Sequence, residues 1–135
     1  MSTATITTVS EHMVAGTVTV HPETEIREAI SALRKHRVSG MAVVDERQGL
    51  VGFLSEKDCL EAYLNSEYHE SPTALVRDVM SCEVATVDPE TDVLSAAEVF
   101  VQKGFHCLPV LRQDRLVGLI RRRDVIGAIQ AMHKR

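Results

Sequence analysis

Two segments of the chain place apolar residues at the spacing of an amphipathic helix. Within residues 26–33, and again within residues 93–100, apolar side chains recur at i, i+3, i+4 and i+7. A short β-rich run precedes each segment, VTV in the first case and ATV in the second. The turn sequences HPET and DPET join each run to its helix. The pattern therefore predicts a strand, a turn and a helix, in that order, twice.

The first residues of these two helices carry capping side chains. We expect Thr24 and Thr91 to be the N-caps, because a threonine hydroxyl accepts a hydrogen bond from a free amide of the first turn. Glu25 and Asp92 then lie in the first turn, where a negative charge is favoured by the helix dipole.

Each predicted helix is followed by two apolar runs and a second helix. We expect MAVV and LPVL to be buried strands, and LVGFL and LVGLI to pair with them across a polar turn. The closing helix then covers each half with an apolar face. The residues of this predicted face are Cys59, Leu60, Tyr63 and Leu64 in the first half, and Val125, Ile126, Ile129 and Met132 in the second.

The two halves of the chain are copies of one another. The segment TVHPET (19–24) aligns with TVDPET (86–91), which is an offset of 67 residues. Past residue 45 the offset becomes 66, because the first copy has one extra residue in the polar turn DERQG compared with RQDR. An insertion in a polar turn is what a duplication predicts, since turns tolerate changes of length.

Each copy has the element order β-α-β-β-α, so the predicted fold class is α+β. A unit of about 55–60 residues buries little apolar surface alone, and we expect the two repeats to pack sheet to sheet with pseudo-two-fold symmetry. Such packing would leave two symmetry-related clefts as binding sites. The predicted divisions are a flexible N-terminus (1–8), repeat 1 (9–66), a connector (67–75), repeat 2 (76–132) and a C-terminal tail (133–135).

Composition and charge narrow the function classes. The net charge of −4 gives no electrostatic reason to expect a nucleic-acid binder. The cysteines, Cys59, Cys82 and Cys107, are far apart and form no CxxC pair, which fits free thiols in a reducing cytoplasm. The first residues lack the regions of a secretion signal, and no apolar stretch approaches the ~20 residues of a membrane helix. We expect a cytoplasmic protein that binds neither nucleic acid nor membrane.

The strings HRVSGMAVVDERQGLVGFLSEKD and GFHCLPVLRQDRLVGLIRRRD, with the duplication, resemble a tandem pair of CBS domains of the cystathionine β-synthase type. The resemblance covers nearly the whole chain. It implies a regulatory module that requires no cofactor and binds an adenosine compound such as AMP, ADP, ATP or S-adenosylmethionine between its repeats. It also implies a homodimer. The chain length leads us to expect that the regulated effector is a separate protein.

The same resemblance implies the ligand-binding residues. In the family, the hairpin ends in Ser or Thr, and an Asp three positions later binds the ribose hydroxyls; Ser55 and Asp58 match this pattern. The adenine pocket uses the first strand and the segment before the buried strand. The full set is Thr17, Val18, Val38, Ser39, Gly40, Met41, Ser55 and Asp58 from one copy, and Val84, Ala85, Phe105, His106, Cys107, Leu108, Arg121 and Asp124 from the other.

Ser55 and Asp58 also have a purely structural interpretation. Ser55 can cap the amide of Asp58, and the Asp58 carboxylate lies favourably near the positive end of the following helix. The two interpretations are compatible, because a helix start is itself an anion site.

The second copy departs from the family pattern, because Arg121 stands where the Ser or Thr is expected. Arg121, Arg122 and Arg123 crowd a predicted helix start, where each cation opposes the dipole by roughly 0.3–1 kcal/mol. One hypothesis is that Arg121 faces a phosphate, which its planar fork binds well. The alternative is that the three side chains reach into solvent, paired loosely with Asp124 or Asp114.

Two other residues of the second copy also leave alternatives open. Phe105 can stack on a base or pack in the core beside its strand. His106 can contact phosphate when protonated, or it can be an ordinary surface histidine.

The sequence favours a non-enzymatic function. It contains no combination of an activated nucleophile, a placed base and an oxyanion site, so we predict no catalytic residues. The histidines show no HExxH or CxxC…H spacing, so we predict no metal site. The leading interpretation is a sensor of adenine nucleotides that modulates a partner protein. The alternative is a constitutive dimerisation or scaffold protein with degenerate clefts.

Overall fold

The computed structural model describes residues 6–65 and 74–133. Most of the predicted N-terminus (1–8), connector (67–75) and C-terminal tail (133–135) lies outside the described residues. Among the described residues, no helix is both long and apolar enough to cross a membrane.

The chain forms two compact units, and each contains a segment from the start of the other copy. One unit comprises Met1–Thr17 and Ala85–Arg135, and the other comprises Val18–Val84. Residues 9–17, which begin the first copy, therefore belong to the unit built from the second copy. Residues 76–84, which begin the second copy, belong to the unit built from the first. We call these units unit 1 and unit 2, and the two segments the exchanged segments.

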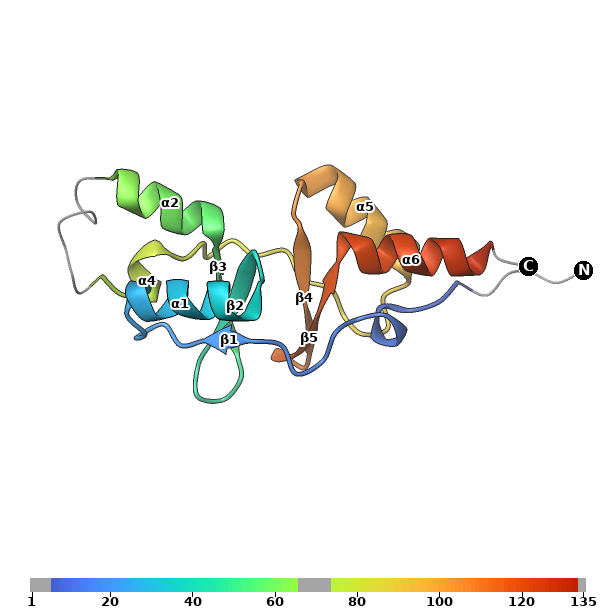
Figure 1. The fold of residues 1–135 in the computed structure, drawn as a ribbon. Coiled ribbons are helices and arrows are strands. Elements are labelled where there is room, and N and C mark those ends of the chain that lie inside the picture. The colour runs from blue at the N-terminus through green and yellow to red at the C-terminus, as the bar shows by residue number, and fades with distance from the viewer. Residues whose placement is uncertain (1–5, 66–73, 134–135) are drawn as a thin grey trace, which may run out of the picture. The chain divides into compact units, whose positions relative to one another are not determined.

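Unit 2 contains a three-stranded sheet of order β1-β2-β3 (Figure 1). Strands β1 and β2 are parallel, and β2 and β3 form an antiparallel hairpin in which Gly40 lies opposite Ser55. The elements of this unit are β1 (Thr19–Val20), α1 (Ile26–His36), β2 (Gly40–Val44), β3 (Leu50–Ser55), α2 (Glu56–Leu64) and α4 (Val76–Val79).

Unit 1 repeats this arrangement with a two-stranded antiparallel sheet, β4-β5. A parallel bridge between Val87 and Val110 takes the place of the β1–β2 pair, because the corresponding residues of the first copy are Val20 and Val43. The elements are the short 3-10 helix η1 (Val9–Glu11), α5 (Val93–Lys103), β4 (Cys107–Arg112), β5 (Arg115–Arg121) and α6 (Arg122–Met132). The predicted α+β class with two sheet-and-helix repeats is confirmed.

Each unit has its own apolar core, and an exchanged segment contributes to each. Val76 is fully buried in unit 2, and Val9, its counterpart in the repeat, is fully buried in unit 1. The core of unit 2 consists of Val20, Ile26, Ala29, Leu33, Met41, Val43, Leu54, Cys59 and Val76. The core of unit 1 consists of Val9, Val87, Ala96, Phe100, Leu108, Val110, Ile120 and Val125.

Each exchanged segment is also joined to a hairpin by backbone hydrogen bonds. Phe53 and Ser81 exchange two bonds of 2.9 Å in unit 2. Val14 and Leu119 do the same in unit 1, at 2.8 and 3.0 Å. These bridges add a short antiparallel contact to the outer edge of each hairpin.

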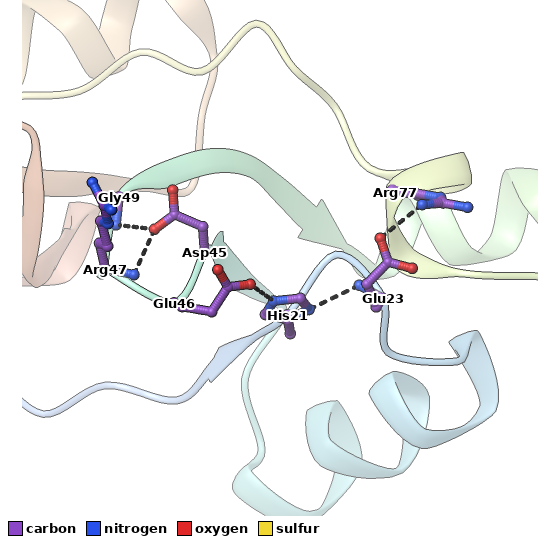
Figure 2. A network of polar contacts seen from close by, with 7 residues as sticks. All are labelled: His21, Glu23, Asp45, Glu46, Arg47, Gly49 and Arg77. Atoms are coloured by element: carbon purple, nitrogen blue, oxygen red, sulfur yellow. Dashed lines mark hydrogen bonds and ion pairs between the residues drawn. The ribbon is translucent and has the colours of Figure 1, made fainter.

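Polar contacts on the surface of unit 2 hold its exchanged segment and its turns (Figure 2). Arg77 donates to Glu23 at 2.7 Å, and the Glu23 amide donates to Nδ1 of His21 at 3.1 Å. Because Nδ1 is the acceptor, Nε2 of His21 carries the proton and donates to Glu46 at 3.0 Å. Asp45 closes the β2–β3 turn by accepting from the amides of residues 47 and 49. The exchanged segment is thus fixed by its polar side chains as well as by its core residue.

The predicted N-caps at Thr24 and Thr91 are wrong by one residue. The cap of α1 is Glu25 and the cap of α5 is Asp92, whose side chain accepts from the Ser95 amide at 2.8 Å. The threonines belong to the preceding turns; the hydroxyl of Thr91, for example, accepts from the Asp88 amide at 3.1 Å. Because the hydroxyl of Thr91 is hydrogen-bonded within the turn, the following residue, Asp92, caps the helix.

The predicted apolar faces of the closing helices are wrong in part. Leu60, Leu64 and Ile126 are 66%, 87% and 66% exposed, and Tyr63 is exposed as well. The residues that α2 buries are Cys59 and Ala62, and those that α6 buries are Val125 and Ala128. In each helix the two buried residues lie three positions apart, and Ile129 of α6 also packs against the core of unit 1, while several larger apolar side chains point outward. Each unit therefore leaves large apolar side chains uncovered on its closing helix.

Candidate ligand-binding site

The fold of unit 2 brings four predicted site residues together where the β2–β3 hairpin meets α2. Gly40 lies opposite Ser55 across the hairpin, and the carbonyl of Ser39 accepts a hydrogen bond from the amide of Glu56 at 2.9 Å. Asp58 lies in the first turn of α2, beside Ser55. The register of the hairpin therefore places Ser39, Gly40, Ser55 and Asp58 around one helix start.

Ser55 and Asp58 form a reciprocal capping box. The hydroxyl of Ser55 accepts from the amide of Asp58 at 3.0 Å, and the amide of Ser55 donates to Oδ2 of Asp58 at 2.9 Å. This confirms the structural interpretation of the SEKD sequence. The ligand-binding role of Asp58 stays a prediction. It is compatible with the capping box, because a carboxylate has more lone pairs than one amide uses.

Ser81 is a neighbour of Asp58 that the sequence did not reveal. Its hydroxyl donates to Oδ1 of Asp58 at 3.2 Å and to Oδ2 at 3.4 Å. The Phe53–Ser81 bridge positions it there. Ser81 lies 23 residues after Asp58, so no local sequence pattern indicates the contact. The two residues meet because the exchanged segment that carries Ser81 belongs to unit 2.

The equivalent place in unit 1 has the same backbone and different side chains. Cys107 lies opposite Arg121 across the β4–β5 hairpin, and the carbonyl of His106 accepts from the amide of Arg122 at 3.3 Å. The amide of Arg121 donates to Oδ2 of Asp124 at 2.8 Å, as Ser55 does to Asp58. The two helix starts are therefore built on one backbone plan.

The guanidinium of Arg121 is paired with Asp124. Nε donates to Oδ2 and Nη2 to Oδ1, both at 2.9 Å, which is the two-pronged geometry of a strong arginine–carboxylate pair. Burial acts to raise the pKa of Asp124, but the hydrogen bonds from the side chain and backbone of Arg121 outweigh it, so this pKa lies below its usual range. The bond to Asp124 in turn raises the pKa of Arg121. This geometry corresponds to the alternative in which Arg121 pairs with Asp124.

Arg122 attaches the segment before β4 to the start of α6. Its Nε donates to the carbonyl of Phe105 at 2.8 Å, and its Nη2 lies 3.0 Å from Nδ1 of His106. The ring of Phe105 packs against the apolar core of unit 1, which favours the core interpretation of this residue. The side chains of Arg122 and His106 therefore contact one another on the surface of the unit.

Most of the other predicted pocket residues contribute to the packing of one unit. Met41 and Leu108 are fully buried, so their side chains belong to the cores. Cys107 is half-buried, and burial raises its pKa to about 11. The remaining residues are Val18 and Val38, packed against the core of unit 2; Ala85, packed against the core of unit 1; and Thr17 and Val84, which are half-buried.

The described residues do not form a metal site. Among residues 6–65 and 74–133, no group of three or more His, Cys, Asp and Glu side chains is placed to hold a metal ion.

Comparison with known proteins identifies the family of these two repeats. The model of the CBS domain matches residues 9–65 and again residues 76–131, so the chain belongs to the CBS-domain family. It is similar to the solved structure of CBSX2 in complex with AMP, with 26% identity and a TM-score of 0.84, over 94% of this chain and 98% of that one. CBSX2 is a CBS-pair protein from Arabidopsis thaliana.

Curated relatives place this CBS pair in proteins of different lengths. The chain is 28% identical over 128 residues to an uncharacterized 17.7 kDa protein of Acidianus ambivalens, which is 94% of this chain and 76% of that protein. It is 31% identical over 116 residues to an inosine-5′-monophosphate dehydrogenase of Aquifex aeolicus, which is 84% of this chain but only 23% of the dehydrogenase. The similarity to the dehydrogenase therefore concerns about a quarter of that enzyme.

Proposed function

We propose that this chain is a non-enzymatic regulatory module that binds an adenosine-containing ligand of the AMP, ADP or ATP class and modulates a partner protein. The observation that carries the proposal is the Asp58 carboxylate at the start of α2, with the hydroxyls of Ser55 and Ser81 beside it. A carboxylate accepts from both hydroxyls of a ribose, and a helix start attracts the phosphate of the same ligand. The AMP complex of CBSX2 supports the choice of an adenosine compound.

Regulation requires that the ligand favour one arrangement of the protein over another. A ligand can shift such an equilibrium only by the difference between its affinities for the two arrangements. We propose that the module is cytoplasmic, acts as a homodimer and regulates a separate effector protein. The exposed apolar side chains of Leu60, Leu64 and Ile126 support the dimer. Light scattering on the purified protein measures its subunit number.

The experiment that tests ligand binding is calorimetric titration with AMP, ADP, ATP and S-adenosylmethionine, with inorganic phosphate as the control. We expect binding of at least one adenosine compound, and weaker binding after Asp58→Asn. The asparagine oxygen can still accept from the Ser55 amide, so this variant removes the charge while retaining the helix cap. Equal affinity of the variant and the wild type would refute the role of Asp58.

A second candidate function is a constitutive dimerisation or scaffold protein with degenerate sites. The Arg121–Asp124 pair favours it for one copy, because the pair occupies the carboxylate that a ribose would need. The absence of any binding at millimolar concentrations of all four compounds would support this second function.

A further inference from the structure

Asp58 and Asp124 occupy equivalent positions of the repeat but are held by different donors. Within the described part of the chain, uncharged donors hold Asp58: the amide of Ser55 at 2.9 Å and the hydroxyl of Ser81 at 3.2 and 3.4 Å. Asp124 accepts from the Arg121 amide and from two nitrogens of the Arg121 guanidinium, at 2.8–2.9 Å. The first carboxylate keeps its negative charge available, and the second is neutralised by its own neighbour.

The strength of these contacts decides which carboxylate a ribose can reach. Charge-assisted bonds with this two-pronged geometry are roughly twice as strong as neutral ones, so two neutral hydroxyls do not readily displace the Arg121 fork. The Ser81 hydroxyl lies at the long end of the hydrogen-bond range, where a ligand hydroxyl can replace it. The side chain of Asp124 is only 13% exposed with the fork in place, while Arg121 is 48% exposed. The fork therefore covers the carboxylate and presents its own outer edge to solvent.

The exchanged segments also differ between the units, and this difference too favours Asp58 as the ribose-binding carboxylate. The exchanged segments bridge to equivalent positions, with Ser81 on Phe53 in unit 2 and Val14 on Leu119 in unit 1. Val14 is the repeat counterpart of Ser81, so unit 1 carries a valine at the position where unit 2 carries the serine hydroxyl. Unit 1 thus lacks both hydroxyls, that of Ser55 and that of Ser81, that neighbour Asp58 in unit 2.

We propose that Arg121 closes the second carboxylate to ribose, so that an adenosine ligand binds through Asp58 alone and with one molecule per chain. Arg121 is then the residue that determines the stoichiometry of the module. This inference rests on the proposed function. It adds that the two copies, though built on one plan, differ in whether they bind the ligand.

Exchanging the side chain at position 121 tests the inference. Arg121→Ser removes the fork and reproduces the Ser55 arrangement at the start of α6. With AMP as the probe, calorimetric titration is expected to give one molecule per chain for the wild type and two for Arg121→Ser. Asp58→Asn is expected to weaken wild-type binding by about 10- to 100-fold, as for loss of a charged hydrogen-bond partner. The double variant Asp58→Asn with Arg121→Ser is expected to recover one molecule per chain.

Arg123→Ser is the matched control, because it removes one cation from the same helix turn and leaves the Arg121–Asp124 pair in place. It is expected to keep one molecule per chain. Circular dichroism of each variant verifies that it is folded. Two molecules per chain in the wild type, or binding that is lost with Asp124→Asn but kept with Asp58→Asn, would overturn the inference and leave the proposed function standing. If neither the wild type nor Arg121→Ser binds AMP, ADP, ATP or S-adenosylmethionine at millimolar concentration, the proposed function itself is overturned.

Discussion

Gly118 lies where the exchanged segment of unit 1 crosses strand β5, and adding a methyl group there should detach the segment. A Cβ at this position would lie 2.8 Å from the carbonyl oxygen of Val14 and 3.0 Å from the sulfur of Met13. Real Cβ atoms do not approach a backbone oxygen this closely, so the segment must move. The movement breaks the two backbone bonds between Val14 and Leu119, of 2.8 and 3.0 Å.

The magnitude follows from those two bonds. A backbone hydrogen bond contributes about 0.5–1.5 kcal/mol net, so Gly118→Ala should lower the free energy of unfolding by roughly 1–3 kcal/mol. Urea denaturation measures that free energy. Amide hydrogen exchange locates the effect, and the amides of Val14 and Leu119 should exchange faster in the variant.

Gly127 supplies the control from the same unit. It lies within α6 and has no atom within 4 Å of an added Cβ, so Gly127→Ala should raise the free energy of unfolding by about 0.5–1 kcal/mol. The two alanines therefore have opposite predicted signs. The reasoning is refuted if Gly118→Ala is as stable as the wild type, or if the amides of Val14 and Leu119 keep their protection.

Three other measurements test separate features. A thiol reagent at pH 7 should label exposed Cys82 first, because burial raises the pKa of Cys59 and of Cys107 to about 11; equal rates for all three thiols would contradict this. Arg37 ends α1 with a left-handed φ of 54°, so Arg37→Gly should stabilise the fold by about 1 kcal/mol in thermal or urea unfolding, and a loss would count against it. Asp124→Asn should lower the free energy of unfolding at pH 7 by about 0.2–1 kcal/mol. Because the folded pKa of Asp124 is depressed, this difference should fade as the pH drops through that pKa, and a difference that does not decline on acidification would disprove the assignment.

The sequence predicted the strands and the longer helices of each copy, because these have strong local signals, but it did not predict the short helices η1 and α4. Self-comparison revealed the duplication, and the spacing of apolar residues located α1 and α5. Local signals were weaker at the element ends, where Thr91 and Asp92 are both good caps and only the turn decides between them. They failed on the outward face of α2, because Leu60 and Leu64 have the composition of a buried face, whereas the residues that α2 buries are Cys59 and Ala62.

Only the contacts between residues close together in the sequence could be predicted for the candidate site. Ser55 and Asp58 are three residues apart, and their mutual capping could be inferred from sequence. The contact of Ser81 with Asp58 forms only if residues 76–84 pack in unit 2 rather than in unit 1. Because the two copies are similar in sequence, no local pattern indicates in which unit this segment packs. The fork of Arg121 on Asp124 depends on a side-chain rotamer, which the sequence left open among several partners.

The exchange of segments sets an order of events during synthesis on the ribosome. Unit 2 is one continuous stretch, Val18–Val84, and all of its partners have been made once that stretch has emerged. Val14 must wait for Leu119, 105 residues later, before its two backbone bonds can form. The segment around Val9 and Val14 is therefore made before unit 2 but secured after it, because the apolar core that contains Val9 is otherwise built from residues 87–125.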